Sequence, residues 1–209
     1  MSLRNAGVSA VILAGGFSVR MGRDKASLPF GDVSLLEHQA QKLRMLGIED
    51  IMISGSGMEL AATRSVPDIY PHRGPLSGIH ACLEAASHDS VLFLSVDTPL
   101  IPIETLQTLL DAHCGGVTLL RHGEQVEPLI GVYDSALAPL CAEILQTEET
   151  KVWSLINQIA LTTVAYMGDS IFLANCNTPE EYHRILAYAR RYHEDEDNER
   201  ICSPIWRSE

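Results

Sequence analysis

The chain has 209 residues, 46% hydrophobic and 20% charged, with a formal net charge of −12 and a pI near 5.0. A chain of this length fits one domain, whose folding buries roughly 70% of the surface that the unfolded chain exposes. Nucleic acids and anionic membranes bind basic surfaces, so we expect neither as a partner of this acidic chain. The five cysteines form no C-x-x-C pair, no apolar run is long enough to span a bilayer, and no signal peptide is recognisable. These features predict a cytoplasmic protein with reduced thiols, without a disulfide framework or a zinc site.

Short apolar runs rich in β-branched residues predict strands, and apolar residues at helical spacing predict helices. In chain order we expect strand 8–14, helix 35–46, strand 50–54, helix 75–87, strand 90–96, helix 102–113, strands 116–120 and 126–133, helix 134–146, a short helix 152–158, strand 161–166 and helix 178–192. Gly47 is a natural C-terminal cap for the first helix, and Asp134 or Ser135 is the expected N-cap of the helix 134–146. Thr178 and Glu181, with proline between them, predict a capping box at the start of the last helix.

Strands alternate with helices at least four times, which predicts an α/β fold. The expected architecture is a three-layer αβα sandwich with a mainly parallel, Rossmann-like sheet. We expect one domain over residues 1–193, followed by a mobile acidic tail over 194–209. In such sheets ligands bind beyond the carboxyl ends of the strands, so motifs at these ends are candidate site residues.

The first such motif, Leu-Ala-Gly-Gly-Phe-Ser-Val-Arg-Met-Gly-Arg-Asp-Lys at residues 13–25, follows the first strand directly. Glycines let the backbone approach a ligand closely, and successive free N–H groups form an anion-binding nest. Arg20 and Lys25 can neutralise phosphate oxygens, whereas the spacing fits neither a Walker A loop nor G-x-G-x-x-G. The motif therefore predicts a phosphate-binding loop, the alternative being a plain strand–helix turn with surface cations.

Asp97 closes the most apolar strand, in the segment Ser-Val-Asp-Thr-Pro at 95–99. A carboxylate together with phosphate oxygens and water is a common way to hold Mg²⁺. We therefore expect Asp97 to be the metal ligand, the alternative being an Asx turn before a helix.

Three further segments carry candidate residues. Asp68 precedes Gly-Pro-Leu-Ser-Gly at 74–78, where Gly74, Pro75 and Gly78 would let a ligand lie against a helix N-terminus. Asp68 is then a candidate acceptor of hydrogen bonds from a base or a sugar. Asn175 and Asn177 alternate along an expected strand end, so that both side chains would face one ligand. The segment Glu-Pro-Leu-Ile-Gly-Val-Tyr at 127–133 is, from its residues alone, a strand with an unusual proline.

In this order, these five segments resemble the molybdenum cofactor guanylyltransferase family, within the MobA-like nucleoside triphosphate transferase superfamily. The matching segments are 13–25, 74–78, 97–99, 127–133 and 175–180, and the resemblance spans roughly residues 8–190. The first motif is shared across the superfamily, and the last two favour the guanylyl over the cytidylyl branch. The chain departs from the pattern at 54–56, Ser-Gly-Ser, where the family often has an asparagine.

The resemblance implies a fold of the nucleotide-diphospho-sugar transferase type that binds GTP and Mg²⁺. The implied nucleotide-binding residues are Leu13, Ala14, Gly15, Gly16, Lys25, Asp68, Gly74, Pro75, Gly78 and Asp97, and the implied catalytic residues are Arg20, Lys25 and Asp97. The implied acceptor is the terminal phosphate of molybdenum-loaded molybdopterin, with Asn175 and Asn177 as candidate acceptor-binding residues. Other proteins of molybdenum cofactor biosynthesis or delivery are candidate partners.

Three alternatives stay open at this stage. One is a cytidylyl- or sugar-phosphate nucleotidyltransferase of the same superfamily. A second is a nucleotide-binding regulatory module without catalysis, which the presence of both Lys25 and Asp97 disfavours. A third is a dinucleotide-binding module built on residues 51–57, where no third glycine follows at Leu60.

Overall fold

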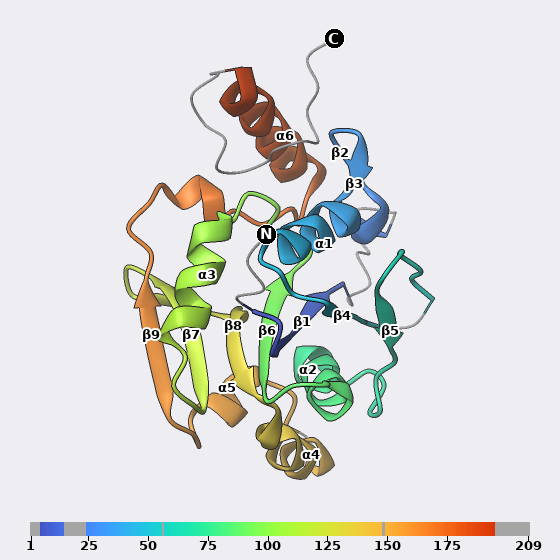
Figure 1. Ribbon diagram of the computed structural model, residues 1–209, viewed down its shortest axis with the longest axis vertical. Coiled ribbons are helices and arrows are strands. Elements are labelled where there is room, and N and C mark those ends of the chain that lie inside the picture. The colour runs from blue at the N-terminus through green and yellow to red at the C-terminus, as the bar shows by residue number, and fades with distance from the viewer. Residues whose placement is uncertain (1–4, 15–23, 56, 148, 195–209) are drawn as a thin grey trace.

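The structure is a computed structural model that describes residues 5–14, 24–55, 57–147 and 149–194 (Figure 1). Its centre is a seven-stranded sheet in the order β5-β4-β1-β6-β8-β7-β9. The strands are β1 Val8–Leu13, β4 Asp50–Ser54, β5 Arg64–Val66, β6 Ser90–Ser95, β7 Val117–His122, β8 Gln125–Asp134 and β9 Leu161–Ala165. Strand β8 runs antiparallel to both of its neighbours, and every other neighbouring pair is parallel. The sheet is therefore mainly parallel, as the sequence predicts.

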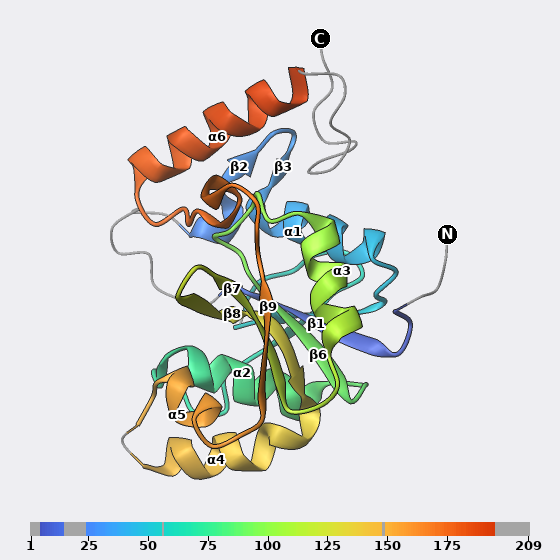
Figure 2. The same ribbon diagram turned by 90° about the vertical axis from the view of Figure 1, so that its left-hand side faces the viewer.

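Helices cover both faces of the sheet (Figure 2). One face carries α1 Leu35–Met45 and α3 Ile103–Ala112, with α6 Pro179–Glu194 farther out over the hairpin of β2 Pro29–Phe30 and β3 Val33–Ser34. The other face carries α2 Gly74–Ala85, α4 Ala138–Gln146 and α5 Val152–Ile156. Three short 3-10 turns complete the described chain: η1 Lys25–Ser27, η2 Ser135–Leu137 and η3 Ser170–Leu173. The predicted three-layer αβα sandwich is confirmed.

Strand β1 shows why both faces need a helical layer. Successive side chains of a strand point to opposite faces, and those of β1 divide between two hydrophobic cores. Ala10 and Ile12 pack in the core under α1 and α3, while Val11 and Leu13 pack in the core under α2 and α4. A strand buried on both faces reads as a continuous apolar run, which is the pattern seen at residues 10–14.

The register of the parallel strands brings three chain segments to one edge of the sheet. Leu13, the last residue of β1, pairs with Ser54 of β4 on one side and with Ser95 of β6 on the other. The residues that follow these three strands, Ala14, Gly55 and the turn containing Asp97, therefore meet beyond the same carboxyl edge.

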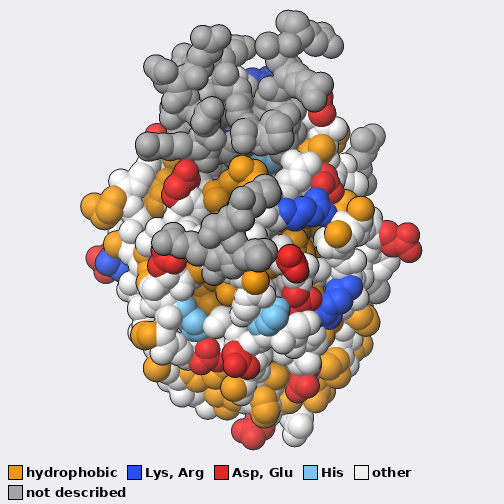
Figure 3. All heavy atoms as spheres, in the orientation of Figure 1, with side chains coloured by type: hydrophobic (Ala, Val, Ile, Leu, Met, Phe, Trp, Pro, Cys, Tyr) orange, Lys and Arg blue, Asp and Glu red, His pale blue; other side chains and the backbone are white. Residues whose placement is uncertain are grey.

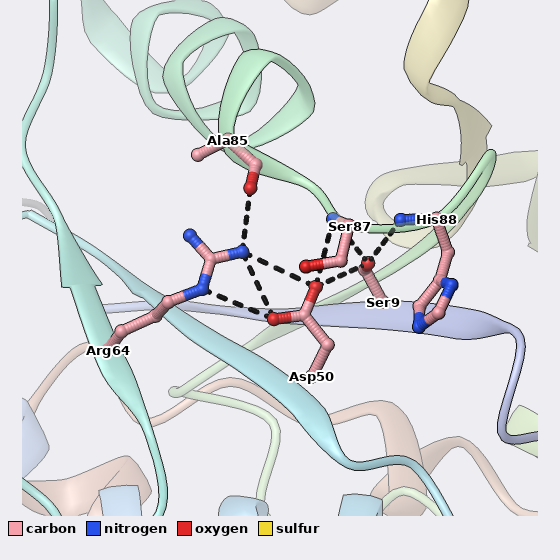
Figure 4. A network of polar contacts seen from close by, with 6 residues as sticks. All are labelled: Ser9, Asp50, Arg64, Ala85, Ser87 and His88. Atoms are coloured by element: carbon pink, nitrogen blue, oxygen red, sulfur yellow. Dashed lines mark hydrogen bonds and ion pairs between the residues drawn. The ribbon is translucent and has the colours of Figure 1, made fainter.

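The amino-terminal ends of the strands are tied together by a polar network around Asp50 (Figure 4). The Asp50 carboxylate accepts hydrogen bonds from Ser9 Oγ at 2.5 Å, from Ser87 N at 3.1 Å and from Arg64 Nη2 at 3.0 Å. Arg64 also donates to the carbonyl oxygen of Ala85, at the C-terminal end of α2, at 2.6 Å. Burial alone would raise the pKa of Asp50, but the bonds from Ser9, Ser87 and Arg64 outweigh it and lower the pKa. The network thus fixes β1, β4, β5 and α2 at the edge opposite the strand carboxyl ends.

Strand β8 leaves its ladder with β7 at the proline that the sequence singles out. Leu119 pairs with Gly131, but the next residue, Leu120, pairs with Glu127, so residues 128–130 bulge out of the register. Pro128 has no N–H group to donate to a ladder, which makes it suited to such a bulge. The buried Tyr133 hydroxyl donates to the Pro128 carbonyl oxygen at 2.5 Å and holds the bulge closed.

Two expectations about local structure need correction. The helix expected over 134–146 begins at Ala138, after a 3-10 turn, because Asp134 ends β8 and its carboxylate accepts from Gly116 N at 2.5 Å instead of capping a helix. The second correction is an addition: strands β2, β3 and β5 are absent from the predicted elements, because two or three residues are too few to show alternation.

The surface seen in Figure 3 carries its acidic side chains dispersed among hydrophobic, polar and basic ones. The net charge of −12 is therefore not gathered into a single acidic patch on this face. Among the described residues, no helix combines the length and apolar character needed to cross a membrane. The tail beyond Glu194 lies outside the described residues.

Candidate functional site

A cavity of about 540 Å³ opens at the carboxyl edge of the parallel strands. Its volume falls within the range of roughly 300–1,000 Å³ that is typical of small-molecule sites. Leu13, Ala14, Lys25, Ser54, Gly55, Pro67, Asp68, Pro71, His72, Gly74, Pro75, Gly78, Ser95, Val96, Asp97 and Leu129 line it. Every nucleotide-binding residue implied by the sequence that the structure describes belongs to this lining. Gly15, Gly16 and Arg20 lie outside the described residues.

The charged end of the cavity joins three predicted residues from distant parts of the chain. Lys25 Nζ lies 3.5 Å from Asp97 Oδ2 and donates to Asn177 Oδ1 at 2.6 Å. The Lys25 and Asp97 side chains are 17% and 20% exposed, so this pair is open to a ligand yet shielded from most bulk water. Ser95 Oγ donates to Asp97 Oδ1 at 2.6 Å and leaves the second carboxylate oxygen toward Lys25.

The short turn η1 sets the position of Lys25. Asp24 caps this turn, with its Oδ1 accepting from Ala26 N at 3.0 Å, and the buried Ala26 side chain anchors the turn in the core. Lys25 is therefore presented at the cavity by a capped turn and not by a regular helix.

The segment that carries Asn175 and Asn177 is not a strand end, so that expectation is wrong. Residues 174–177 form an irregular connection between η3 and α6. Their backbone groups have other partners: Cys176 N donates to the Asp97 carbonyl oxygen at 2.8 Å, and Asn177 N donates to Glu181 Oε2 at 2.9 Å. The segment is thus pinned to the Asp97 turn. Both asparagines are exposed and neither lines the cavity, but Asn177 reaches Lys25 at its charged end.

The predicted capping box at the start of α6 is confirmed. Glu181 N donates to Thr178 Oγ1 at 3.2 Å, and Thr178 N donates to Glu181 Oε2 at 3.0 Å. This reciprocal pair ends the irregular connection and fixes where Asn177 stands.

Burial also sets the chemistry of Cys176, which lies between the two asparagines. Burial first, and the charge of Asp97 next, raise the pKa of the Cys176 thiol to about 12, although Lys25 opposes the shift. The thiol is therefore protonated at neutral pH and is a poor nucleophile.

The other end of the cavity lies between the ends of β4 and β5 and the start of α2. A Cβ atom on Gly78 would overlap the Ser54 hydroxyl and would lie 3.6 Å from Asp68 Oδ1. Glycine at this position therefore allows Ser54 and Asp68 to lie close against α2. Burial raises the pKa of the Asp68 carboxyl, with the charge of His72 opposing it.

The first turn of α2 faces this end of the cavity. Arg73 precedes the helix and makes no side-chain cap hydrogen bond, and Gly74 adopts a left-handed φ of 66°. Pro75 at the first turn needs no hydrogen-bond acceptor, and Gly74 and Pro75 both line the cavity. The partial positive charge at a helix N-terminus favours an anionic or electron-rich ligand here.

Several lining residues escape prediction from the sequence. Ser54 and Leu129 stand in segments that the sequence singles out, but neither residue is itself a predicted site residue, and His72 carries no signal of its own; tertiary packing brings all three to the cavity. For Leu129 a signal does exist, because Pro128 in an otherwise strand-like run indicates a bulge. Glu127, at the start of the bulge, is half-buried and accepts from Gln125 Nε2 at 2.7 Å. Burial and the nearby negative charge of Asp97 raise the pKa of Glu127.

A mainly parallel α/β sheet with a lysine, a carboxylate and a glycine-flanked helix N-terminus around one carboxyl-edge cavity has the features of a nucleotide-binding enzyme. Residues 10–164 match the family model of the MobA-like NTP transferase domain. The chain therefore belongs to the MobA-like NTP transferase family, and its class of enzyme is nucleotidyltransferase.

Curated relatives align over most of the chain. The chain is 31% identical over 189 residues to a probable molybdenum cofactor guanylyltransferase of Carboxydothermus hydrogenoformans, an alignment that covers 86% of this chain and 95% of the relative. It is 31% identical over 183 residues to the molybdenum cofactor guanylyltransferase of Xanthomonas euvesicatoria pv. vesicatoria, covering 85% and 94%.

Solved structures share the fold. One is molybdopterin-guanine dinucleotide biosynthesis protein A from Archaeoglobus fulgidus, with a TM-score of 0.72, 19% identity, and 88% of this chain and 99% of that chain covered. Another is a Mycobacterium tuberculosis protein crystallised in complex with manganese, with a TM-score of 0.64, 18% identity, and 87% and 98% covered.

Proposed function

We propose that this enzyme transfers GMP from GTP to the terminal phosphate of molybdenum-loaded molybdopterin and releases pyrophosphate. An oxygen of the acceptor phosphate forms a bond to the α-phosphorus, while the bond from that phosphorus to the bridging oxygen of the β-phosphate breaks. The observation that carries the proposal is the convergence of Lys25, Asp68, Gly78 and Asp97 on one cavity. Relatives named molybdenum cofactor guanylyltransferase support GTP and this acceptor.

The cavity suggests how GTP lies across the strand ends. The base and ribose would occupy the end between Ser54, Asp68 and Gly78, where the Asp68 carboxylate can accept hydrogen bonds from N–H or O–H groups. The phosphates would extend past Leu13 and Ala14 to the charged end at Lys25 and Asp97. Arg20, which lies outside the described residues, is proposed to act with Lys25 on the phosphates.

Asp97 and Asn177 fit a divalent cation, which we propose is Mg²⁺. Mg²⁺ commonly takes one or two carboxylates and completes its shell with substrate phosphates and water. Within the described part of the chain, no three His, Cys, Asp or Glu side chains are grouped to hold a metal alone. A single aspartate beside an amide oxygen therefore suits an ion held jointly with the nucleotide. When bound, such an ion would stabilise the negative charge that develops on departing pyrophosphate.

The protein's own contribution is position and charge. The nucleophile is a phosphate oxygen that is already anionic, so no strong general base is required. Lys25 neutralises phosphate oxygens, and the bonds from Ser95 and Cys176 hold the Asp97 turn. Alignment and pre-set electrostatics of this kind supply most of the rate in phosphoryl and nucleotidyl transfer. Asn175 and Asn177 are proposed as acceptor-binding residues, and of the two it is Asn177 that contacts a residue of the cavity, Lys25.

Ligand selectivity tests the proposal. The unfolding temperature of the full chain is measured in the presence of each of the four common triphosphates with Mg²⁺. Pyrophosphate release is measured on a separate sample with purified molybdopterin. A ligand at 100 times its Kd stabilises the folded state by about 2.7 kcal/mol, so a selective ligand is easily seen. We expect GTP to stabilise the chain most and to release pyrophosphate only with the acceptor present. Equal stabilisation by CTP, or turnover with a sugar phosphate instead of molybdopterin, would contradict the guanylyl assignment.

A further inference from the structure

Three polar side chains of α1 contact the turn that carries Asp97. His38, Gln39 and Lys42 are 1%, 0% and 2% exposed, although helix α1 has a solvent-facing side available for polar residues. Their spacing of three and four residues sets them on one face of the helix. That face points at the segment 95–101, which links the end of β6 to α3.

Each of the three side chains donates to a backbone carbonyl of this segment. Gln39 Nε2 donates to Ser95 O at 2.9 Å and to Thr98 O at 3.0 Å. Lys42 Nζ donates to Ile101 O at 2.9 Å and also to Pro99 O, and His38 Nε2 donates to Pro99 O at 2.8 Å. The α1 clamp, as we call His38, Gln39 and Lys42, thus satisfies four carbonyl groups of one short segment.

Burying three polar side chains on one face of α1 costs free energy, which indicates that the position of the turn they hold is important. Burying an amide or an ammonium group costs free energy that its hydrogen bonds only partly recover, and lysine is almost never fully buried. Leucines on the same face of α1 would avoid this cost but would leave the four carbonyl groups without these donors. The two carbonyls bound by Gln39 bracket Asp97, so a shift of Asp97 along or out of the turn must break one of these bonds.

We infer that the α1 clamp consists of positioning residues, which fix Asp97 at the place where it meets the metal and the phosphates. The inference rests on the proposed role of Asp97. Gln39 is the principal member, because it alone binds on both sides of Asp97. Lys42 and His38 hold the part of the segment that follows Asp97, through the carbonyl groups of residues 99 and 101. A displacement of about 1 Å in a reacting constellation can lower a rate about a hundredfold, so a small loosening is measurable.

The test compares Gln39→Met with two matched variants of the same helix. Gln39→Met keeps the side-chain length and removes both donors. Gln41→Met removes an amide whose Nε2 donates, among the described residues, to Glu37 Oε1 at 3.2 Å and does not reach the Asp97 turn. Leu43→Ala removes a fully buried side chain that makes none of these hydrogen bonds and so controls for lost stability. Lys42→Met is measured in parallel, so that the test stands if Gln39→Met does not fold.

Two readouts are needed: kcat for pyrophosphate release, and the affinity for Mn²⁺ in the presence of GTP, followed by electron paramagnetic resonance. For Gln39→Met we expect kcat to fall at least tenfold and the Mn²⁺ Kd to rise severalfold. The Kd of GTP measured without metal should change less than threefold. Lys42→Met should move the same quantities in the same direction. Gln41→Met and Leu43→Ala should keep the wild-type values at a temperature where they are folded.

Folded Gln39→Met and Lys42→Met with wild-type kcat and Mn²⁺ affinity would overturn the inference. An equal loss of kcat and of Mn²⁺ affinity in Leu43→Ala would also overturn it, because the effect would then follow from reduced stability in general. If the wild-type chain releases no pyrophosphate with GTP and molybdopterin, the proposed function fails. The Mn²⁺ titration would still decide the role of the clamp.

Discussion

Replacing Gly78 by alanine separates a packing role from a ligand-binding role. A Cβ atom at this position would overlap the hydroxyl oxygen of Ser54, while it would lie at ordinary contact distances of 3.5 Å from Ser54 Cβ and 3.6 Å from Asp68 Oδ1. The overlap is therefore with the end of one small side chain, which can rotate away. Alanine is favoured over glycine within a helix by about 1 kcal/mol, which offsets part of the rearrangement. We expect the free energy of unfolding to change by no more than about 1 kcal/mol.

Nucleotide binding should suffer far more than stability. The added methyl group and the rotated hydroxyl both enter the lining where we propose that the base and ribose lie. Overfilling a packed site costs about 1–3 kcal/mol, which corresponds to a loss of GTP affinity of about 5- to 150-fold. Affinity is measured by calorimetric titration with GTP and Mg²⁺, and stability by thermal or denaturant unfolding of the same sample.

Ser54→Ala supplies the control through a double-mutant cycle. In the Ser54→Ala background the overlap with the hydroxyl is gone, so Gly78→Ala should lower the affinity for GTP much less than it does in the wild type. The coupling free energy between the two substitutions in GTP binding should exceed about 1 kcal/mol. Wild-type GTP affinity in Gly78→Ala, together with a stability loss above about 3 kcal/mol, would refute the reasoning. Gly78 would then serve helix packing and not the ligand.

Three further substitutions probe other parts of the account. Lys25→Ala should leave folding intact, weaken GTP binding and lower pyrophosphate release at least tenfold, and unchanged turnover would remove Lys25 from the site. Tyr133→Phe leaves the partly buried Pro128 without the donor of its carbonyl oxygen and should lower the free energy of unfolding by about 1–3 kcal/mol, as denaturant unfolding would show. An equally stable variant would mean that the bulge needs no such bond. Asp50→Asn should lower the free energy of unfolding by about 1–3 kcal/mol at pH 7, because the lowered pKa of Asp50 stabilises the fold above its usual value of 3.8. That difference should shrink as the pH falls through the folded-state pKa, below 3.8, and a constant difference down to pH 2 would contradict the role of the Asp50 charge.

The central strands and most of the cavity follow from the sequence because their signals are local. A strand buried on both faces is a continuous apolar run, and a parallel sheet sends the residues after its strands to one edge. Leu13 and Asp97 therefore converge as expected without any knowledge of tertiary contacts.

What escapes the sequence depends on contacts between distant segments. Periodicity assigns polar residues of an amphipathic helix to the solvent side, yet Gln39 and Lys42 are buried because carbonyl groups of the Asp97 turn lie opposite them. The alternation of Asn175 and Asn177 suggests a strand, but Cys176 between them donates its backbone N–H to Asp97, and Asn177 donates its backbone N–H to Glu181. Neither partner is visible from local pattern alone.

Asp97→Asn gives the most direct test of the central claim, that this cavity is the site of nucleotidyl transfer. The substitution keeps the shape and the bond from Ser95 but removes the charge proposed to meet the metal. Unfolding temperature, GTP affinity and pyrophosphate release with molybdopterin are measured on one preparation over a series of Mg²⁺ concentrations. We predict normal folding, a GTP affinity within about threefold, and a rate lower by about 10²-fold or more, the usual loss when one electrostatic stabiliser is removed. Pyrophosphate release at the wild-type rate, with the wild-type Mg²⁺ dependence, would contradict the account and reduce Asp97 to a turn residue.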